Sequence, residues 1–122
     1  QAKVHYAVMD AATVQWPESV YDAVVAIFIQ FADPAMRRRL FEQITNVLKP
    51  GGVLLLQGYG PRQLEYRTGG PPLISHLYTA DQLRLELPGL IVESIEEYED
   101  VLDEGTGHHG RSALVGLVAR RP

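Results

Sequence analysis

The sequence predicts an α/β protein with helices packed outside a mostly parallel sheet. Residues 21–31 and 53–59 are apolar enough to be buried strands, and a helix with a clear 3.6-residue period separates them. A shorter helix and two further strands follow. This alternation of strands and helices produces a layered sheet, because each crossover helix must pack back onto the sheet.

Composition limits the protein to one domain and excludes several kinds of site. The chain has 122 residues, of which 46% are hydrophobic, and its formal net charge of -4 does not favour nucleic acid or an anionic membrane as the main partner. The absence of cysteine excludes disulfides, thiolate metal sites and a cysteine nucleophile. No apolar run approaches the ~20 residues that span a bilayer, so we expect a soluble, cytoplasmic protein.

The first half of the chain should hold two strands and the main helix. Residues 3–10 alternate between polar and apolar and predict a short strand that ends at Asp10. Residues 21–31 follow as a strand buried on both faces. Asp33 and Pro34 form a helix start, and the apolar stripe that follows contains Arg37, which we expect to snorkel towards solvent as part of a mostly solvated basic face.

The second half should hold a strand, a long loop, a short helix and a final hairpin. Residues 53–59 form a buried strand, and residues 60–78 are rich in glycine and proline and predict a long loop of the kind that often carries function. "TADQ" at 79–82 has the capping-box form and predicts a helix that ends before Pro88. Residues 90–101 are an acidic edge strand, which pairs with 112–121 in antiparallel fashion.

The order of elements places four segments at one edge of the sheet. In layered α/β sheets, ligands bind at the carboxyl ends of the strands. The segments at those ends are Asp10 with Ala11, Gln30 with Phe31, Gln57–Tyr59, and Asp103–Gly110. We therefore expect them to share one active rim.

The glycines near the middle of the chain do not form a phosphate loop. Such a loop follows a strand and opens a helix, whose free amides hold the anion. Gly51 and Gly52 follow a helix and open a strand, which is the reverse order, and so they predict a turn. "GYG" at 58–60 follows a strand, but it opens a loop and lacks the lysine and spacing of a phosphate loop.

Two stretches resemble a known family. "YDAVVAIFIQF", followed by a helix and "LKPGGVLLLQGY", resembles the second half of the class I S-adenosylmethionine-dependent methyltransferases. "GYGPRQLEYRTGGPP" and "LDEGTGHHG" are similar to a small bacterial branch close to the tellurite-resistance and thiopurine methyltransferases. The resemblance covers essentially the whole chain, most securely residues 21–60.

The resemblance implies a Rossmann-like class I methyltransferase fold, a three-layer sandwich with strand order 3-2-1-4-5-7-6. The family's first strand, its "GxGxG" loop and the acidic end of its second strand are absent from these residues. We therefore expect residues 1–122 to be the C-terminal portion of a single methyltransferase domain. Residues 23–29 would then be an exposed apolar edge, from which we expect a homodimer, strand exchange, or that these residues are part of a larger chain.

The resemblance also implies S-adenosyl-L-methionine as cofactor. By position in the family, Asp10 and Ala11 would meet the adenine amine and ring nitrogen, and the fourth-strand segment would line the methionine arm through Ile27, Phe28 and Gln30. A carboxylate accepts from an amine, which suits Asp10. The alternatives remain that Asp10 is an ordinary turn residue and that Gln30 is a solvated amide at a strand end.

Residues that would contact the methyl acceptor lie in or beside the long loop, at the end of the fourth strand and on the last hairpin. They are Phe31, Tyr59, Gln63, Tyr66, His76 and His108. His108 is a possible catalytic residue, because a histidine there could take a proton from the acceptor. The alternative is that the adjacent His108 and His109 are plain surface residues; we expect no metal site, because adjacent histidines point apart.

The predicted function is methyl transfer to a small-molecule acceptor by in-line displacement, a reaction that depends mainly on orientation and a partly desolvated nucleophile. The alternative is a non-catalytic oligomerisation or interaction module with a truncated methyltransferase fold. A dinucleotide oxidoreductase shares the layered architecture, but it needs a glycine loop that the sequence lacks.

Overall fold

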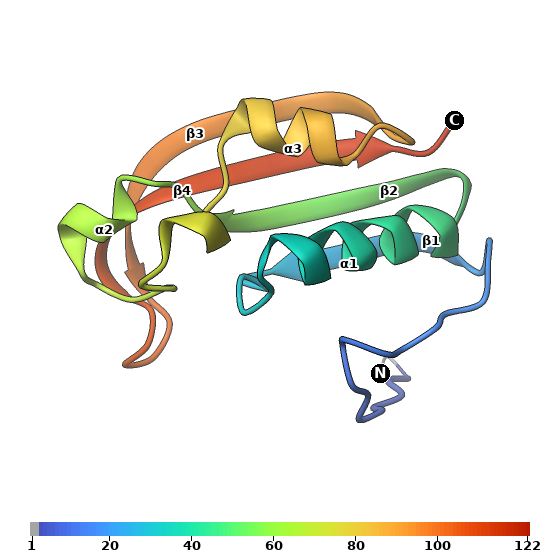
Figure 1. The fold of residues 1–122 in the computed structure, drawn as a ribbon, viewed down its shortest axis with the longest axis horizontal. Coiled ribbons are helices and arrows are strands. Elements are labelled where there is room, and N and C mark those ends of the chain that lie inside the picture. Colours follow the sequence, from blue (N-terminus) through green and yellow to red (C-terminus); the bar gives the residue numbers. More distant parts are fainter. Residues whose placement is uncertain (1–2) are drawn as a thin grey trace.

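A computed structural model describes residues 3–122, which form one sheet with helices packed on it (Figure 1). None of the helices in these residues is long and apolar enough to cross a membrane. The elements in chain order are β1 (Tyr21–Ile27), α1 (Pro34–Val47), β2 (Leu48–Tyr59), α2 (Gln63–Tyr66), the 3₁₀ turn η1 (Ile74–His76), α3 (Ala80–Glu86), β3 (Ile91–Asp103) and β4 (His109–Arg120).

The sheet has the order β1-β2-β4-β3. β1 and β2 are parallel, with Val24 opposite Leu54, whereas β4 runs antiparallel to both β2 and β3. This order confirms the 4-5-7-6 half of the predicted methyltransferase topology and the predicted antiparallel pairing of the last two strands. β3 lies at one edge, as expected for the acidic strand.

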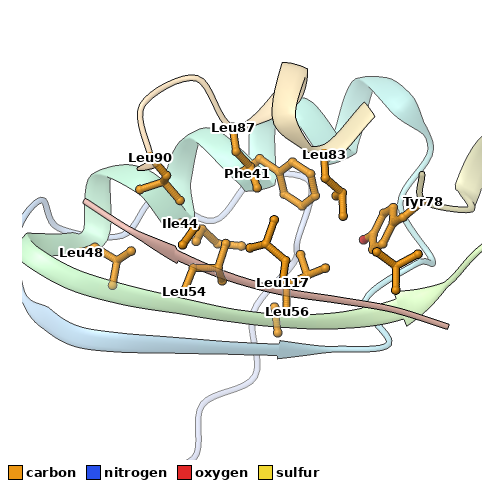
Figure 2. Close-up of a cluster of buried hydrophobic side chains, with 13 residues drawn as sticks. Phe41, Ile44, Leu48, Leu54, Leu56, Tyr78, Leu83, Leu87, Leu90 and Leu117 are labelled. Atoms are coloured by element: carbon orange, nitrogen blue, oxygen red, sulfur yellow. The ribbon is translucent and has the colours of Figure 1, made fainter. Parts of the chain in front are cut away.

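The core lies between the sheet and one layer of helices (Figure 2). Phe41 and Ile44 of α1 and Leu83 of α3 all lie over the same face of the sheet, where they meet Leu54 of β2 and Leu117 of β4. Each such side chain contributes about 1.5–3 kcal/mol when it is fully buried. α1 and α3 therefore fix the sheet from one side and leave the strand ends free to form the rim.

The start of α1 confirms the prediction from the sequence. Asp33 caps the helix, because its Oδ1 accepts from the backbone N–H of Met36 at 2.9 Å, and Pro34 occupies the first turn. Arg37, however, does not snorkel. Its side chain is 3% exposed and makes a bidentate ion pair with Glu86 of α3, with N–O distances of 2.8 and 3.0 Å.

Gly51 and Gly52 lie inside β2, which begins before the predicted residues 53–59, at the place where its register against β1 shifts between Leu48 and Val53. Gly51 has φ +81°, which an L side chain rarely adopts, and its N–H donates to the carbonyl of Arg121 at 2.7 Å. The strand begins at Leu48, so the two glycines stand at the opposite end of β2 from Tyr59. The glycine pair is therefore a structural turn away from the rim.

The predicted strand at residues 3–10 is wrong. These residues pair with no strand of the described sheet, and Tyr6 and Val8 are fully exposed. A short alternating segment forms a strand only when its own neighbour supplies backbone partners, and in the predicted order 3-2-1-4-5-7-6 that neighbour is the family's second strand, which residues 3–122 do not contain. β1 is consequently an edge strand, and its Val25 and Ile27 are 60% and 52% exposed, as the sequence predicted.

The opposite face of the sheet is covered by no helix of residues 3–122, so these residues supply two of the three predicted layers. An open hollow on that face is lined by Ile27, Leu55 and Tyr98. The long loop contains more structure than expected, because α2 and η1 both lie within it. The start of α3 is as predicted, since Thr79 Oγ1 accepts from Gln82 N–H at 3.1 Å.

Two adjacent leucines of β2 test which face of the sheet carries the core. Leu54 is 0% exposed and Leu55 is 41% exposed. We expect Leu54→Ala to lower the free energy of unfolding by about 2–5 kcal/mol, because it leaves a cavity under α1. Leu55→Ala is the matched control and should change it by less than about 1 kcal/mol. Equal shifts of the urea midpoint for the two variants would contradict this assignment.

Candidate functional site

A pocket of about 440 Å³ lies at the carboxyl ends of β1 and β2. The long loop and the β3–β4 hairpin complete its wall. Its lining contains six of the residues predicted for the site: Phe28, Gln30, Phe31, Tyr59, His76 and His108. Gly70, Pro71 and Pro72 complete the lining; "GGPP" predicted their loop but not their place in the pocket. We call this cavity the rim pocket.

Phe28 enters the rim pocket through an uncommon backbone conformation. It follows the last residue of β1 with φ +53°, and its N–H still donates to the carbonyl of Gln57 at 2.9 Å. A non-glycine residue in this region costs about 1–3 kcal/mol, and such strain clusters at functional sites. The conformation ends the strand and carries the aromatic ring to the rim.

Three rings lie nearly parallel in the pocket wall. Phe28 stacks on Tyr59 with centroids 4.8 Å apart and on His108 with centroids 4.4 Å apart. The planes of Tyr59 and His108 differ by 14°, and Tyr59 Oη lies 2.5 Å from His108 Nδ1. The phenol and the imidazole are thus joined by a hydrogen bond, and Phe28 packs against both of them.

Tyr59 is held in its neutral form. Tyr59 is fully buried, and burial raises the pKa of its phenol above the ordinary value, with a smaller contribution from the negative charge of Glu104. A phenol with a raised pKa keeps its proton at neutral pH. Tyr59 therefore keeps an O–H group that can donate a hydrogen bond in the pocket wall.

Gln30 connects three parts of the rim. It is 3% exposed; its Nε2 donates to the carbonyls of Tyr59 at 2.8 Å and His76 at 3.0 Å, and its Oε1 accepts from Tyr59 N–H at 2.6 Å. Both amide hydrogens and one acceptor position are thus used within the protein. Gly58 permits this contact, because a Cβ there would lie 2.7 Å from Gln30 Oε1.

His76 is fixed by the same residue. Its Nδ1 lies 2.9 Å from the backbone carbonyl of Gln30, so Gln30 contacts both the ring and the main chain of His76. On the other side of the pocket, Gly70 lies against Tyr59, where a Cβ would be 2.5 Å from the ring, and Gly69 forms an isolated bridge with His108. The two glycines allow the long loop to close on the aromatic wall.

A second, mostly apolar cavity of about 250 Å³ adjoins the first. Its lining includes Ala11, Val14, Ile29 and Phe31, and Phe31 lines the rim pocket as well. Asp10 stands at the turn that leads into this lining. One of its carboxylate oxygens accepts from Ala12 N–H at 2.8 Å. We call this second space the side cavity.

The remaining predicted residues lie elsewhere. Ile27 lines the open face of the sheet, and Gln63 is buried as a support that accepts from Ala113 N–H at 2.9 Å. Tyr66 donates to Glu99 at 2.6 Å, outside the rim pocket. His109 is exposed beside Asp103 and is likewise absent from the pocket lining.

The contacts of Gln30 can be tested with a variant of similar volume. Gln30→Met should lower the free energy of unfolding, because each buried polar group left without a partner, above all Tyr59 N–H, costs about 1–3 kcal/mol. Gln57→Met is the control: Gln57 faces the open side of the sheet, and its side chain bonds to no residue within 3–122. Urea denaturation of both variants measures the effect, and an unchanged Gln30→Met midpoint would refute it.

Comparison with known proteins indicates similarity to methyltransferases. Residues 1–56 match the model of the "Methyltransferase domain" family. A tRNA N(3)-cytidine methyltransferase, METTL2 of Xenopus tropicalis, is 33% identical over 72 residues, which are 56% of this chain and 21% of that protein. The chain thus spans about a fifth of the length of this curated relative.

Solved structures share the fold over nearly all of the chain. A SAM-dependent methyltransferase from Methanosarcina mazei superposes with a TM-score of 0.74 at 22% identity, covering 98% of this chain and 68% of that one. TehB from Haemophilus influenzae superposes with a TM-score of 0.68 at 16% identity, covering 95% and 40%. The small bacterial branch suggested by the sequence is compatible with these likenesses. By the family match of residues 1–56 and by its strand order, the chain is similar to the S-adenosylmethionine-dependent methyltransferases and shares the class I fold of the solved ones.

Proposed function

We propose that the protein transfers a methyl group from S-adenosylmethionine to a small, uncharged acceptor in the rim pocket. The observation that carries the proposal is the arrangement of two adjoining cavities that share Phe31. One cavity suits a flat heterocycle, and the other suits a neutral acceptor. A methyltransferase needs these two compartments side by side, because donor and acceptor must meet in line.

The side cavity fits the adenine end of the cofactor. Adenine offers an amine donor and ring-nitrogen acceptors, which call for a carboxylate oxygen and a backbone N–H. Asp10 has a second carboxylate oxygen without a partner among residues 3–122, and the N–H of Ala11 is likewise unpaired within that range. Val14 and Ile29 supply apolar contact for the ring faces. Residues 3–122 contain no glycine loop for the methionine end of the cofactor.

The rim pocket supplies orientation and exclusion of water. When bound, the cofactor supplies a methyl group on a positively charged sulfur. Phe28 and Phe31 line the pocket with aromatic rings, whose faces attract cations. Gln30 holds the rim in one geometry through its buried amide. These residues position the reacting groups without a metal or an acid.

The acceptor is proposed to be small and neutral. Of the residues within 3–122 that line the rim pocket, none is Asp, Glu, Lys or Arg. A protonated amine would lack a carboxylate partner there, and a phosphate would lack a Lys or Arg partner. METTL2 acts on tRNA according to its name, whereas the net charge of -4 in this chain gives no support to a nucleic-acid acceptor.

Asp10→Asn tests the cofactor site in the natural protein that carries these residues. The asparagine oxygen can still accept from Ala12 N–H, but an amide donor replaces the free carboxylate oxygen and opposes the adenine amine. Calorimetry should show S-adenosylhomocysteine binding that weakens about tenfold or more in the variant. Asp22→Asn, the same charge change at an exposed site, is the control. If the unaltered protein binds no S-adenosylhomocysteine, the proposed function fails.

We also propose self-association of the 122-residue chain through β1. Edge strands with exposed valine and isoleucine offer unpaired backbone groups to a second copy, and a lysine on such an edge opposes pairing. Val25→Lys should therefore reduce the mass measured by light scattering towards that of one 13.6 kDa chain. Val101→Lys on β3, an equally exposed position at the other edge, should leave it unchanged. A wild-type chain that is monomeric at all concentrations would contradict self-association.

A further inference from the structure

The rim pocket contains two histidines whose hydrogen bonds favour opposite tautomers. We propose that His76 presents an unprotonated Nε2 and takes the proton of the methyl acceptor, while His108 presents an Nε2–H that donates to the same acceptor. The role of His76 rests on the proposed function, whereas the two tautomers do not. The sequence pointed instead to His108 as the possible proton acceptor.

The tautomer of His76 follows from its partner. A backbone carbonyl can only accept, so Nδ1 must carry the hydrogen in its 2.9 Å contact with the carbonyl of Gln30. In the neutral imidazole the lone pair then lies on Nε2. Gln30 also donates from its side chain to the carbonyl of His76 at 3.0 Å. The ring is therefore held with its basic nitrogen directed away from Gln30.

The tautomer of His108 follows from Tyr59. The buried phenol keeps its proton, and within residues 3–122 its only hydrogen-bond partner is His108 Nδ1 at 2.5 Å. A phenol can donate or accept, but the hydrogen of this buried Oη is paired only when it donates to Nδ1, and that arrangement leaves the single hydrogen of the neutral imidazole on Nε2. Phe28 stacks on both rings and holds them in this alignment. His108 is thus arranged to donate a hydrogen bond and not to take a proton.

Both Nε2 atoms are available to a bound molecule. Neither has a hydrogen-bond partner within residues 3–122, and neither is a buried atom without a partner. Both side chains are half-buried and line the rim pocket. The pocket therefore offers one acceptor and one donor to the same molecule.

The two Nε2 atoms, one an acceptor and one a donor, define the class of methyl acceptor. A neutral molecule with a nucleophilic X–H group and a second lone pair on or near X satisfies both histidines: a phenol, a thiol or a heteroaromatic ring. The near-parallel rings of Phe28, Tyr59 and His108 favour a flat molecule. As X forms its bond to the methyl carbon, the bond from that carbon to sulfur breaks and sulfur keeps the electron pair. The proton of X passes to His76 Nε2.

The tautomers can be measured directly by NMR on the protein labelled with ¹⁵N-histidine, without cofactor or acceptor. We expect neutral His76 to be protonated at Nδ1 and neutral His108 at Nε2. Tyr59→Phe should free Nδ1 of His108 and mix its tautomers while leaving His76 unchanged. His76→Asn and His108→Asn assign the two signals. A neutral His76 protonated at Nε2 would overturn the proposal.

Measurements of kcat distinguish whether His76 acts as a base or only supports the structure. His76→Asn retains an N–H near the position of Nδ1 and removes Nε2. With 4-methylphenol, whose proton must be removed, we expect kcat to fall about 10²–10⁴-fold. With 4-nitrothiophenol, already ionised at neutral pH, kcat should change far less. Equal losses on the two acceptors would overturn the role of His76 as the base.

The two proposals fail on different measurements. The proposed function is contradicted if the unaltered protein binds no S-adenosylhomocysteine. The role of His76 as base is contradicted by the wrong tautomer, or by equal kcat losses on the two acceptors when His76→Asn binds S-adenosylhomocysteine as tightly as the wild type. His109→Asn serves as the control for both, because His109 is exposed and lies outside the pocket lining.

Discussion

The buried amide of Gln30 is the interaction on which the rim depends. It joins the end of β1 to the end of β2 through Tyr59 and to the η1 turn through His76. A buried amide with its partners in place fixes geometry, because any shift would leave polar groups unpaired at a cost of about 1–3 kcal/mol each. Hydrogen bonds therefore determine the geometry of the rim, whereas apolar packing determines the position of the helix layer.

The aromatic wall follows from that constraint. With Tyr59 held by Gln30, its phenol can reach His108 on a hairpin that is remote in sequence, and Phe28 closes over both rings. Gly70 permits close approach of the loop on the ring of Tyr59. The resulting pocket is aromatic, and none of the residues within 3–122 that line it is Asp, Glu, Lys or Arg, which suits a neutral flat acceptor.

Most of the fold was predictable, since its elements carry strong local patterns. The capped helix after Asp33, the turn at Gly51 and the final antiparallel pair all follow from residues within a few positions of each other. The predictions that were wrong depend on partners that are distant in the sequence. Residues 3–10 pair with no strand of the described sheet, and Arg37 is buried because Glu86 of α3 faces it, which no local pattern reveals.

The sequence by itself determined the family resemblance, the strand order at the rim and six of the residues that line the pocket, because strand ends in such sheets share one edge. Only the tertiary structure decided what each residue does there. Gln30 holds the rim together because its hydrogen-bond partners surround it. His76 and His108 differ in tautomer because one contacts a carbonyl and the other a phenol. A histidine's tautomer is set by its neighbour in space, and sequence alone does not name that neighbour.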